Sequence, residues 1–396
     1  MISVTKLIVG DEYSGDALRY RPGASRMKHG TTAGHGPVVV WNMTRTCNLR
    51  CRHCYMDADE KAHTGELTTA EAKAFIDNLA EFRSPALLFS GGEPLVRSDF
   101  FELAAYARDR GVRPTLSTNG TLITRDAAKK IKEVGVTYVG ISLDGLADVN
   151  DDFRGREGAY AAAMRGIQNC VAVGQRVGLR FTINAHNVRE LDPIFDFIEA
   201  EHIDRACFYH LVYSGRGEAM AEEDVTPAQS RAALATILRR TRDFAARGLK
   251  KEILTVDNHC DGVYLYLTAK AEGNEPLARR IWDFLAMNGG NRSGIAFGEV
   301  DPEGNVHPDQ FTQHHTFGNV RERKFSEIWQ DMTHPILAGL KDRKPLLRGR
   351  CSVCRFLNVC NGNFRTRAEA RTGDFWASDP ACYLTDEEIG VGGDGR

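Results

Sequence analysis

From residue 38 onward, short apolar segments alternate with segments of helical periodicity, and this order leaves few folds open to the chain. The predicted strands are residues 38–41, 87–89, 115–117, 138–142, 178–183 and 206–211. The predicted helices are residues 68–82, 100–110, 126–134, 160–173 and 190–201. Thr68 and Glu71 have the form of a capping box, which marks a helix start. This alternation predicts an α/β fold with a parallel sheet, and six such repeats can form a partial barrel.

The first cysteine motif, with Cys47, Cys51 and Cys54, follows the first predicted strand. Three thiolates can hold three irons of a [4Fe–4S] cluster and leave the fourth iron open to a small molecule. The alternative is zinc, but a structural zinc site needs four ligands. His53 could be the fourth, yet it directly precedes Cys54, and neighbouring residues rarely reach the same ion. The spacing therefore favours a reactive [4Fe–4S] cluster.

Three further motifs stand at the ends of predicted strands. Gly91-Gly92-Glu93-Pro94 follows the strand at 87–89, and its glycines permit close approach because they have no Cβ. The others are Leu-Ser-Thr-Asn-Gly at 116–120 and Gly-Ile-Ser-Leu-Asp-Gly at 140–145. Ligands of parallel α/β barrels bind at the carboxyl ends of the strands, so these motifs predict one site at that edge.

The cysteine motif and these three segments, in this order, resemble the radical SAM enzymes. The resemblance implies a partial (β/α)6 barrel that binds S-adenosylmethionine beside the cluster. Gly91, Gly92 and Glu93 would hold the methionine amine, and Arg180 could also help. The further matches to the family's ribose and carboxylate contacts are Ser117, Asn119, Ser142 and Arg154.

The family's chemistry is then the expected chemistry. The reduced cluster would split S-adenosylmethionine to a 5′-deoxyadenosyl radical, which takes a hydrogen atom from the substrate, while the protein orients the reactants and excludes water. The electron would come from a donor such as flavodoxin or ferredoxin. A structural or regulatory iron–sulfur protein is the alternative, but it would not need the turn at 91–94, and formation of 5′-deoxyadenosine would separate the two.

A second cysteine set lies near the end of the chain: Cys351, Cys354, Cys360 and Cys382. Four ligands make a closed site, for which zinc and [4Fe–4S] are both possible chemically. The spacing resembles the auxiliary-cluster domain of SPASM/Twitch radical SAM enzymes, which implies a [4Fe–4S] cluster. The fuller SPASM pattern has another cysteine where this chain reads His307-Pro308-Asp309, so we expect one auxiliary cluster and two clusters in all.

Three cysteines remain outside these sets. Cys170 and Cys207 are expected to be small buried hydrophobic residues. Cys260 lies in a polar run and is a candidate residue of the substrate pocket.

The expected organisation has four parts. Residues 1–36 are a polar lead-in on the surface or near a partner, 37–225 the radical SAM core, 226–293 a helical linker region, and 294–396 the cysteine-rich auxiliary-cluster domain. Amphipathic helices are predicted at 226–245 and 276–287, and a hairpin at 295–308.

The resemblance narrows to the tetrapyrrole-tailoring branch of the family. Its motifs are residues 210–217, 258–264, 304–311, 318–321 and 379–384. The segment 306–311 with His314 and His315 is most similar to the enzymes that remove two acetate side chains from didecarboxysirohaem, giving iron-coproporphyrin. The branch also includes side-chain removal for the haem of nitrite reductase and decarboxylation of two propionates of iron-coproporphyrin. A peptide-modifying SPASM enzyme is a more distant alternative, since about 36 residues are too few for a separate peptide-binding domain.

A substrate of this branch has several carboxylates and a flat apolar ring. The pocket therefore needs cationic donors, of which arginine binds carboxylates bidentately, and apolar or aromatic walls. A histidine could also be an axial ligand of the substrate iron. The candidates are His210, Tyr213, Arg216, His259, Asp261, Tyr264 and His307, with His314 and His315 in addition.

Composition limits the remaining possibilities. The 51 basic and 53 acidic residues give a net charge of −2, which argues against a nucleic-acid partner bound through phosphates. No apolar run approaches the roughly 20 residues needed to span a bilayer, and the first residues lack the apolar core of a signal peptide. The cysteines cluster as metal ligands, which suits the reducing cytoplasm.

Overall fold

A curved sheet runs through the centre of the computed structural model, which describes residues 1–23, 26–31 and 35–391. Within these residues the sheet has ten strands in the order β1-β8-β7-β6-β5-β4-β3-β2-β9-β10. Their bounds are β1 Ile2–Ser3, β2 Val38–Asn42, β3 Ala86–Ser90, β4 Arg113–Thr118, β5 Val139–Ser142, β6 Val177–Ile183, β7 Arg205–His210, β8 Glu252–Val256, β9 Phe297–Val300 and β10 Val306–His307. Strands β2 to β8 are parallel neighbours, so the predicted strands and the partial (β/α)6 barrel are confirmed.

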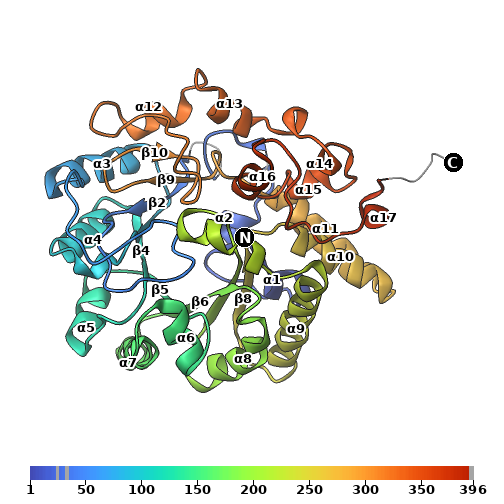
Figure 1. The fold of residues 1–396 in the computed structure, drawn as a ribbon, viewed down its shortest axis with the longest axis horizontal. Helices are drawn as coiled ribbons and strands as arrows, with labels where there is room; N and C mark the ends of the chain where they lie inside the picture. Colours follow the sequence, from blue (N-terminus) through green and yellow to red (C-terminus); the bar gives the residue numbers. More distant parts are fainter. Residues whose placement is uncertain (24–25, 32–34, 392–396) are drawn as a thin grey trace.

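Helices cover the outer face of this sheet, as Figure 1 shows for α3, α4, α5, α7, α8 and α9. Those of the first two-thirds are α1 Val4–Ile8, α2 Asp16–Arg19, α3 Thr69–Glu81, α4 Phe100–Asp109, α5 Arg125–Glu133, α6 Ala147–Arg154, α7 Ala159–Ala172, α8 Leu191–Ala200, α9 Pro227–Ala246, α10 Cys260–Ala271 and α11 Glu275–Asn288. The remainder are α12 Phe325–Gln330, α13 Pro335–Lys341, α14 Arg350–Val353, α15 Leu357–Cys360, α16 Arg365–Thr372 and α17 Asp386–Ile389. The predicted capping box is present, since the Thr68 and Glu71 side chains bind each other's backbone N–H.

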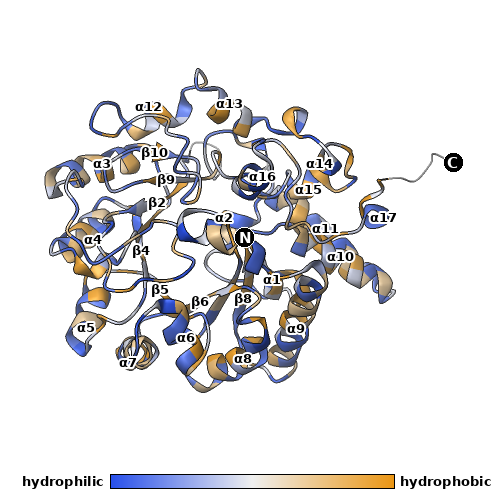
Figure 2. Ribbon diagram, in the orientation of Figure 1, coloured by the Kyte–Doolittle hydropathy of each residue, from blue (hydrophilic) through white to orange (hydrophobic). Residues whose placement is uncertain are grey.

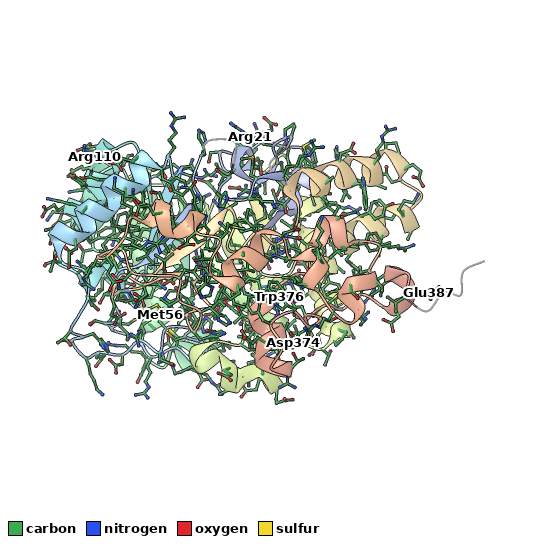
Figure 3. The ribbon with its side chains drawn as sticks, turned by 90° about the horizontal axis from the view of Figure 1, so that it is seen from above. Arg21, Met56, Arg110, Asp374, Trp376 and Glu387 are labelled. Carbon is green, nitrogen blue, oxygen red and sulfur yellow. The ribbon has the colours of Figure 1, made fainter. Side chains whose placement is uncertain are left out.

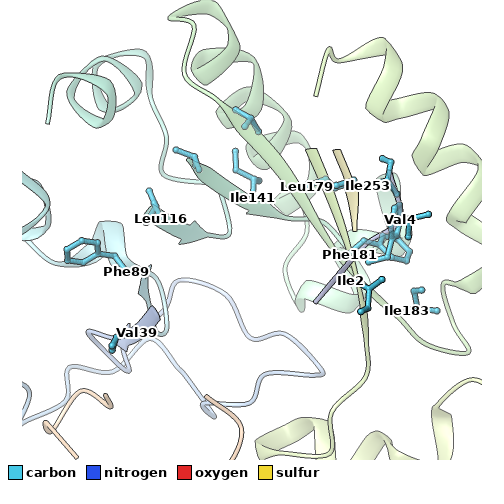
Figure 4. Packing of buried hydrophobic residues seen from close by; sticks show 14 of the residues in the cluster. Ile2, Val4, Val39, Phe89, Leu116, Ile141, Leu179, Phe181, Ile183 and Ile253 are labelled. Atoms are coloured by element: carbon cyan, nitrogen blue, oxygen red, sulfur yellow. The ribbon is translucent and has the colours of Figure 1, made fainter. Parts of the chain in front are cut away.

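The core follows from the apolar strand residues. Phe89, Leu116, Ile141 and Leu179 on successive strands are fully buried, and Figure 4 shows them in one layer behind the sheet. Burial of each such side chain contributes about 1.5–3 kcal/mol to folding. The helices carry mixed polar and apolar surfaces, as Figure 2 shows for α7 and α9, because one face packs on the strands and the other meets water.

The first residues of the chain lie in the core, and the expectation of a surface lead-in is wrong for them. Ile2, Val4 and Leu7 are at most 1% exposed. Strand β1 pairs antiparallel with β8, so it covers backbone groups that would otherwise form an open sheet edge. Three apolar side chains at this spacing can be buried only because β8 is present beside them.

The later segments also enter the sheet. The stretch 226–293, expected to be helical, contains β8 between α9 and α10. The predicted hairpin is present as β9 and β10, and β9 pairs in parallel with β2. The sheet therefore crosses the expected limits at 36/37, 225/226 and 293/294, which stay predictions.

The C-terminal segment from α12 to α17 packs beside the open side of the sheet (Figure 1). Figure 3 shows it from above, with Trp376 over the body of the protein and Glu387 near its end. Among the described residues, no helix combines the length and apolar character needed to cross a membrane.

Candidate active site

The loop after β2 brings three thiols to one cavity. Cys47, Cys51 and Cys54 line a hollow of about 130 Å³ at the carboxyl ends of the strands. Burial raises the pKa of the Cys47 thiol to about 12, so without a bound cation it stays protonated. Arg216 stabilises the loop, because its guanidinium donates to the backbone oxygens of Cys51 at 2.8 Å and Ala58 at 3.1 Å.

His53 also lines this cavity, but its surroundings do not favour a zinc site. Its Nε2 lies 3.5 Å from the Asp144 carboxylate, and its ring packs on Phe153 at 4.8 Å between centroids. The cavity thus offers three thiols and an imidazole that already faces a carboxylate. This set fits three iron ligands better than four zinc ligands.

The glycine turn packs against the strand-to-loop junction itself. Gly91 has φ +127°, and a Cβ there would lie 2.5 Å from the Thr44 oxygen. A Cβ on Gly92 would overlap the carbonyl oxygen of Thr46. The Gly92 N–H donates to Thr44 O at 2.7 Å. Both glycines are required because backbone lies on backbone here, one to three residues before Cys47.

The side chain of Glu93 does not lie where its predicted contact with the methionine amine would place it. Its carboxylate is fully buried and is absent from the cavity lining. It accepts hydrogen bonds from Leu95 N, Thr118 Oγ1 and Asn119 N, the last two at 2.7 and 2.8 Å. Burial raises the pKa of Glu93 to about 7. The structure thus assigns Glu93 to positioning the end of β4, and its contact with the methionine amine stays a prediction.

The other residues predicted to bind S-adenosylmethionine meet at the same cavity. They are Gly91, Gly92, Ser117, Asn119, Ser142, Arg154 and Arg180. Arg154 forms a buried ion pair with Asp144, and its Nη1 lies 3.5 Å from Cys51 Sγ. Asn119 donates to Asn48 Oδ1 at 2.8 Å, which ties the end of β4 to the cysteine loop.

A second cavity of about 300 Å³ adjoins the first inside the barrel. The two share Arg180, Tyr209, Asp257, Gln310 and Phe311 as lining residues. Its apolar and aromatic walls include Leu88, Tyr138, Phe297 and Phe364. Sequence reasoning did not find this cavity, because its lining comes from every part of the chain.

Asp257 stands where the two cavities meet. It follows β8 with φ +64°, a left-handed conformation that is uncommon outside glycine and concentrates at functional sites. Among the described residues, no hydrogen-bond partner reaches its buried Oδ2. Burial raises the pKa of Asp257 to about 6. The motif at 258–264 begins one residue after Asp257, and without predicting β8 the sequence could not select Asp257 itself.

The four cysteines of the second set also lie around one cavity. Cys351, Cys354, Cys360 and Cys382 line a small cavity of about 30 Å³ together with Cys260. The Cys260 thiol is in hydrogen-bonding contact with Cys382 and lowers the pKa of that thiol. Cys260 lines neither the first nor the second cavity, and its place in the substrate pocket stays a prediction. Cys170 is buried as expected, and Cys207 is buried but lines the second cavity.

Comparison with known proteins identifies the family. The model of the radical SAM superfamily matches residues 41–198, and that of the SPASM iron–sulfur cluster-binding domain matches 297–355. The Fe-coproporphyrin III synthase of Methanosarcina barkeri is 55% identical over 396 residues, which cover 98% of this chain and 99% of that protein. The chain belongs to the radical SAM superfamily.

Other relatives agree with this placement. The pre-heme d1 synthase of Dinoroseobacter shibae is 42% identical over 95% of this chain and 92% of its own length. The structure of Streptococcus suis SuiB bound to S-adenosylmethionine superposes with a TM-score of 0.70 at 16% identity, over 89% of this chain and 78% of that one, and shows the shared fold. As a radical SAM enzyme with a SPASM domain, the protein uses S-adenosylmethionine and [4Fe–4S] clusters.

Some of the residues predicted to bind substrate in this radical SAM enzyme line the two cavities, and others do not. His210 and Arg216 line the first cavity, and His259 lines the second. Those that line neither are Tyr213, Asp261, Tyr264 and His307.

These four side chains have other partners. Asp261 binds His210 Nε2 at 3.0 Å and the Tyr383 hydroxyl at 2.7 Å. The Tyr213 hydroxyl donates to Asp224, the ring of Tyr264 packs on Tyr383, and His307 lies 3.3 Å from Asp301. Each of the four side chains thus points into a polar or aromatic contact within the protein, and its role toward the substrate stays a prediction.

Proposed function

We propose that the protein is an Fe-coproporphyrin III synthase, which removes two acetate side chains from didecarboxysirohaem through a 5′-deoxyadenosyl radical. The observation that carries the proposal is the pair of adjoining cavities. One collects three thiols and the glycine turn, and the other is larger and has apolar walls. A relative over half identical along nearly the whole chain has the name of this product.

We propose that one [4Fe–4S] cluster is held by Cys47, Cys51 and Cys54. Three thiols at one cavity leave one iron for S-adenosylmethionine. The auxiliary cluster would be held by Cys351, Cys354, Cys360 and Cys382, which share one small cavity. When bound, the reduced cluster and S-adenosylmethionine supply a carbon radical that removes a hydrogen atom from the substrate.

The chain's own residues orient the reactants. Ser117, Asn119 and Ser142 present polar groups from two neighbouring strand ends, those of β4 and β5, where a ribose or carboxylate can bind. Arg154 places a guanidinium nitrogen 3.5 Å from Cys51 Sγ and so positions that side chain in the cysteine loop. Asp257 places a carboxyl group with a pKa raised to about 6 between the cavities, and the side chains of Tyr209 and Phe311 restrict water at that passage.

A second candidate function is the side-chain removal of haem d1 synthesis, favoured by the Dinoroseobacter relative at 42% identity. Both reactions take a tetrapyrrole into the inner cavity, so the geometry serves either. The higher identity and greater coverage of the Methanosarcina relative favour the first candidate function, removal of acetate side chains from didecarboxysirohaem.

We further propose that the electron comes from a small redox protein such as flavodoxin or ferredoxin, in the cytoplasm. The ten cysteines are all thiols without disulfides, which suits a reducing compartment.

The test is anaerobic turnover. The reconstituted, reduced protein is given S-adenosylmethionine and didecarboxysirohaem, and the product is weighed by mass spectrometry. Loss of both acetate groups to give iron-coproporphyrin supports the proposal. A product of the haem d1 type would support the second candidate, and 5′-deoxyadenosine without any tetrapyrrole change would refute both. Cys47→Ala is the control for radical formation.

A further inference from the structure

The charges of the inner cavity do not balance within the protein. Five arginines contribute to its lining: Arg19, Arg113, Arg180, Arg205 and Arg292. Glu252, which is fully buried, lies 2.5 Å from Arg19 and 3.6 Å from Arg205. It also binds Arg176 at 2.8 Å. One carboxylate is thus shared by three guanidinium groups, and it reaches only two of the five that line the cavity.

The remaining three have no carboxylate partner among the described residues. Arg113 forms no hydrogen bond or ion pair there, and burial together with the nearby Arg205, Arg176 and Arg19 lowers its pKa. Arg292 donates only to the backbone oxygens of Met27 and Gly30, at 3.2 and 3.0 Å. Burial lowers the pKa of Arg292 to about 10.

Arg180 differs from these two in position. Its guanidinium lies over the ring of Tyr209, 4.8 Å from the centroid. It lines both cavities, whereas Arg113 and Arg292 line only the inner one.

Two carboxyl groups line the same cavity, and neither forms an ion pair with these arginines. Asp309 accepts hydrogen bonds from Phe311 N, Thr312 N and Thr312 Oγ1. Burial raises the pKa of Asp257, and the charges of the N-terminal amine, Arg367 and Arg180 only partly offset this. Arg113, Arg180 and Arg292 are half-buried. A guanidinium in a partly enclosed cavity without an anion is unfavourable, because no ion pair offsets its loss of solvation.

We propose that Arg113, Arg180 and Arg292 bind carboxylates of the tetrapyrrole. Arg180 binds the side chain that reacts, since it reaches the cavity of the cysteines, and this assignment replaces its predicted contact with S-adenosylmethionine. Arg113 and Arg292 bind carboxylates that stay on the ring. The inference rests on the proposed function. It places these three arginines ahead of Arg216, whose Nε and Nη1 already donate to Cys51 O and Ala58 O.

The shape of the cavity agrees with this assignment. Tyr138, Tyr209, Phe297 and Phe364 provide aromatic surface between the arginines, which suits a flat macrocycle. A guanidinium can bind a carboxylate through two parallel hydrogen bonds, so each arginine can fix one propionate or acetate group.

The test is a binding titration with the anaerobically reconstituted holoenzyme. Iron-coproporphyrin III, with four carboxylates, is compared with iron-mesoporphyrin IX, with two, by the shift of the Soret band. Arg113→Gln and Arg292→Gln are compared with Arg110→Gln, an exposed arginine of the outer surface (Figure 3). Circular dichroism and iron content show that each variant is folded and loaded.

We expect each inner variant to weaken binding of iron-coproporphyrin about tenfold or more, and Arg110→Gln to leave it unchanged. The loss of affinity in these variants should be smaller for iron-mesoporphyrin, which has fewer carboxylates. Equal affinities of wild type and both inner variants would overturn the assignment. Failure of the wild type to bind either porphyrin would instead refute the proposed function.

Turnover separates the two roles. Arg113→Gln and Arg292→Gln should raise KM with little change in kcat, because they act on carboxylates that do not react. Arg180→Gln should lower kcat as well. A change confined to KM in Arg180→Gln would refute its placement at the reacting side chain.

Discussion

The buried ion pair between Arg367 and Asp379 joins the C-terminal segment to the barrel, and its removal should destabilise the whole protein. Both side chains are 0% exposed, and the guanidinium donates to both carboxylate oxygens at 3.0 and 2.8 Å. It also donates to the backbone oxygens of Leu211 at 3.1 Å and Asp257 at 2.5 Å. Arg367→Met removes four hydrogen bonds and leaves a buried carboxylate without its cation.

The expected loss follows from these contacts. Removing one partner of a buried pair costs about 3–5 kcal/mol in the free energy of unfolding, because the remaining charge is uncompensated. Arg348 is the control, since its ion pair with Asp374 leaves it 71% exposed, and Arg348→Met should cost at most about 1 kcal/mol. The double variant Arg367→Met with Asp379→Leu should be more stable than Arg367→Met alone.

The assay is urea unfolding of the cluster-free proteins, followed by far-ultraviolet circular dichroism and linear extrapolation. A cost below about 1 kcal/mol for Arg367→Met, equal to that of Arg348→Met, would refute the reasoning. The reasoning would also be refuted if adding Asp379→Leu to Arg367→Met lowered the free energy of unfolding as much as Asp379→Leu does in the wild type.

The pH dependence gives an independent check. Burial by itself would raise the pKa of Asp379, but the charge of Arg367 outweighs it and holds the pKa below the ordinary 3.8. A depressed carboxyl pKa adds stability that is fully present above the unfolded value and lost as pH falls through the folded value. The difference between wild type and Arg367→Met should therefore shrink below about pH 4.

Three further outcomes are expected. Gly92→Ala should lose S-adenosylmethionine binding in equilibrium dialysis and about 1–3 kcal/mol of stability, because its Cβ would overlap Thr46 O; unchanged affinity would contradict this. Asp257 ionises near pH 6, so 5′-deoxyadenosine formation should show an inflection there that Asp257→Asn removes, and an identical pH profile would exclude a role for its proton. Cys260→Ala should keep the auxiliary cluster but lower its reduction potential, measured by electron paramagnetic resonance, since a donor to Cys382 is lost; loss of that cluster's iron would make Cys260 a ligand instead.

The local pattern of apolar residues was enough to predict the core of the fold. The six strands from β2 to β7 and the helices between them were predictable. The periodicity of apolar residues, and capping residues such as Thr68, specify secondary structure within one short segment. The two cysteine sets and the residues at the carboxyl ends of the strands were predictable for a related reason. Parallel strands bring their ends to one edge, so motifs that follow strands meet without further information.

Strands β1 and β8 were missed because both form by pairing with segments distant in the sequence: β8 pairs with β7, and β1 pairs with β8. Residues 2–3 and 252–256 are short and mixed in character, and neither has a strand pattern of sufficient length. Pairing between Ile2 and Thr255 supplies what local propensity does not.

The barrel strands, the two cysteine sets and the glycine turn are encoded by spacing along short stretches of chain. Which charges are available to a ligand depends on how distant parts of the chain pack. Glu252 binds Arg19, 233 residues away, whereas Arg113, Arg180 and Arg292 have no carboxylate partner within the described residues. An arginine's identity is local, but whether an anion already lies beside it depends on long-range packing.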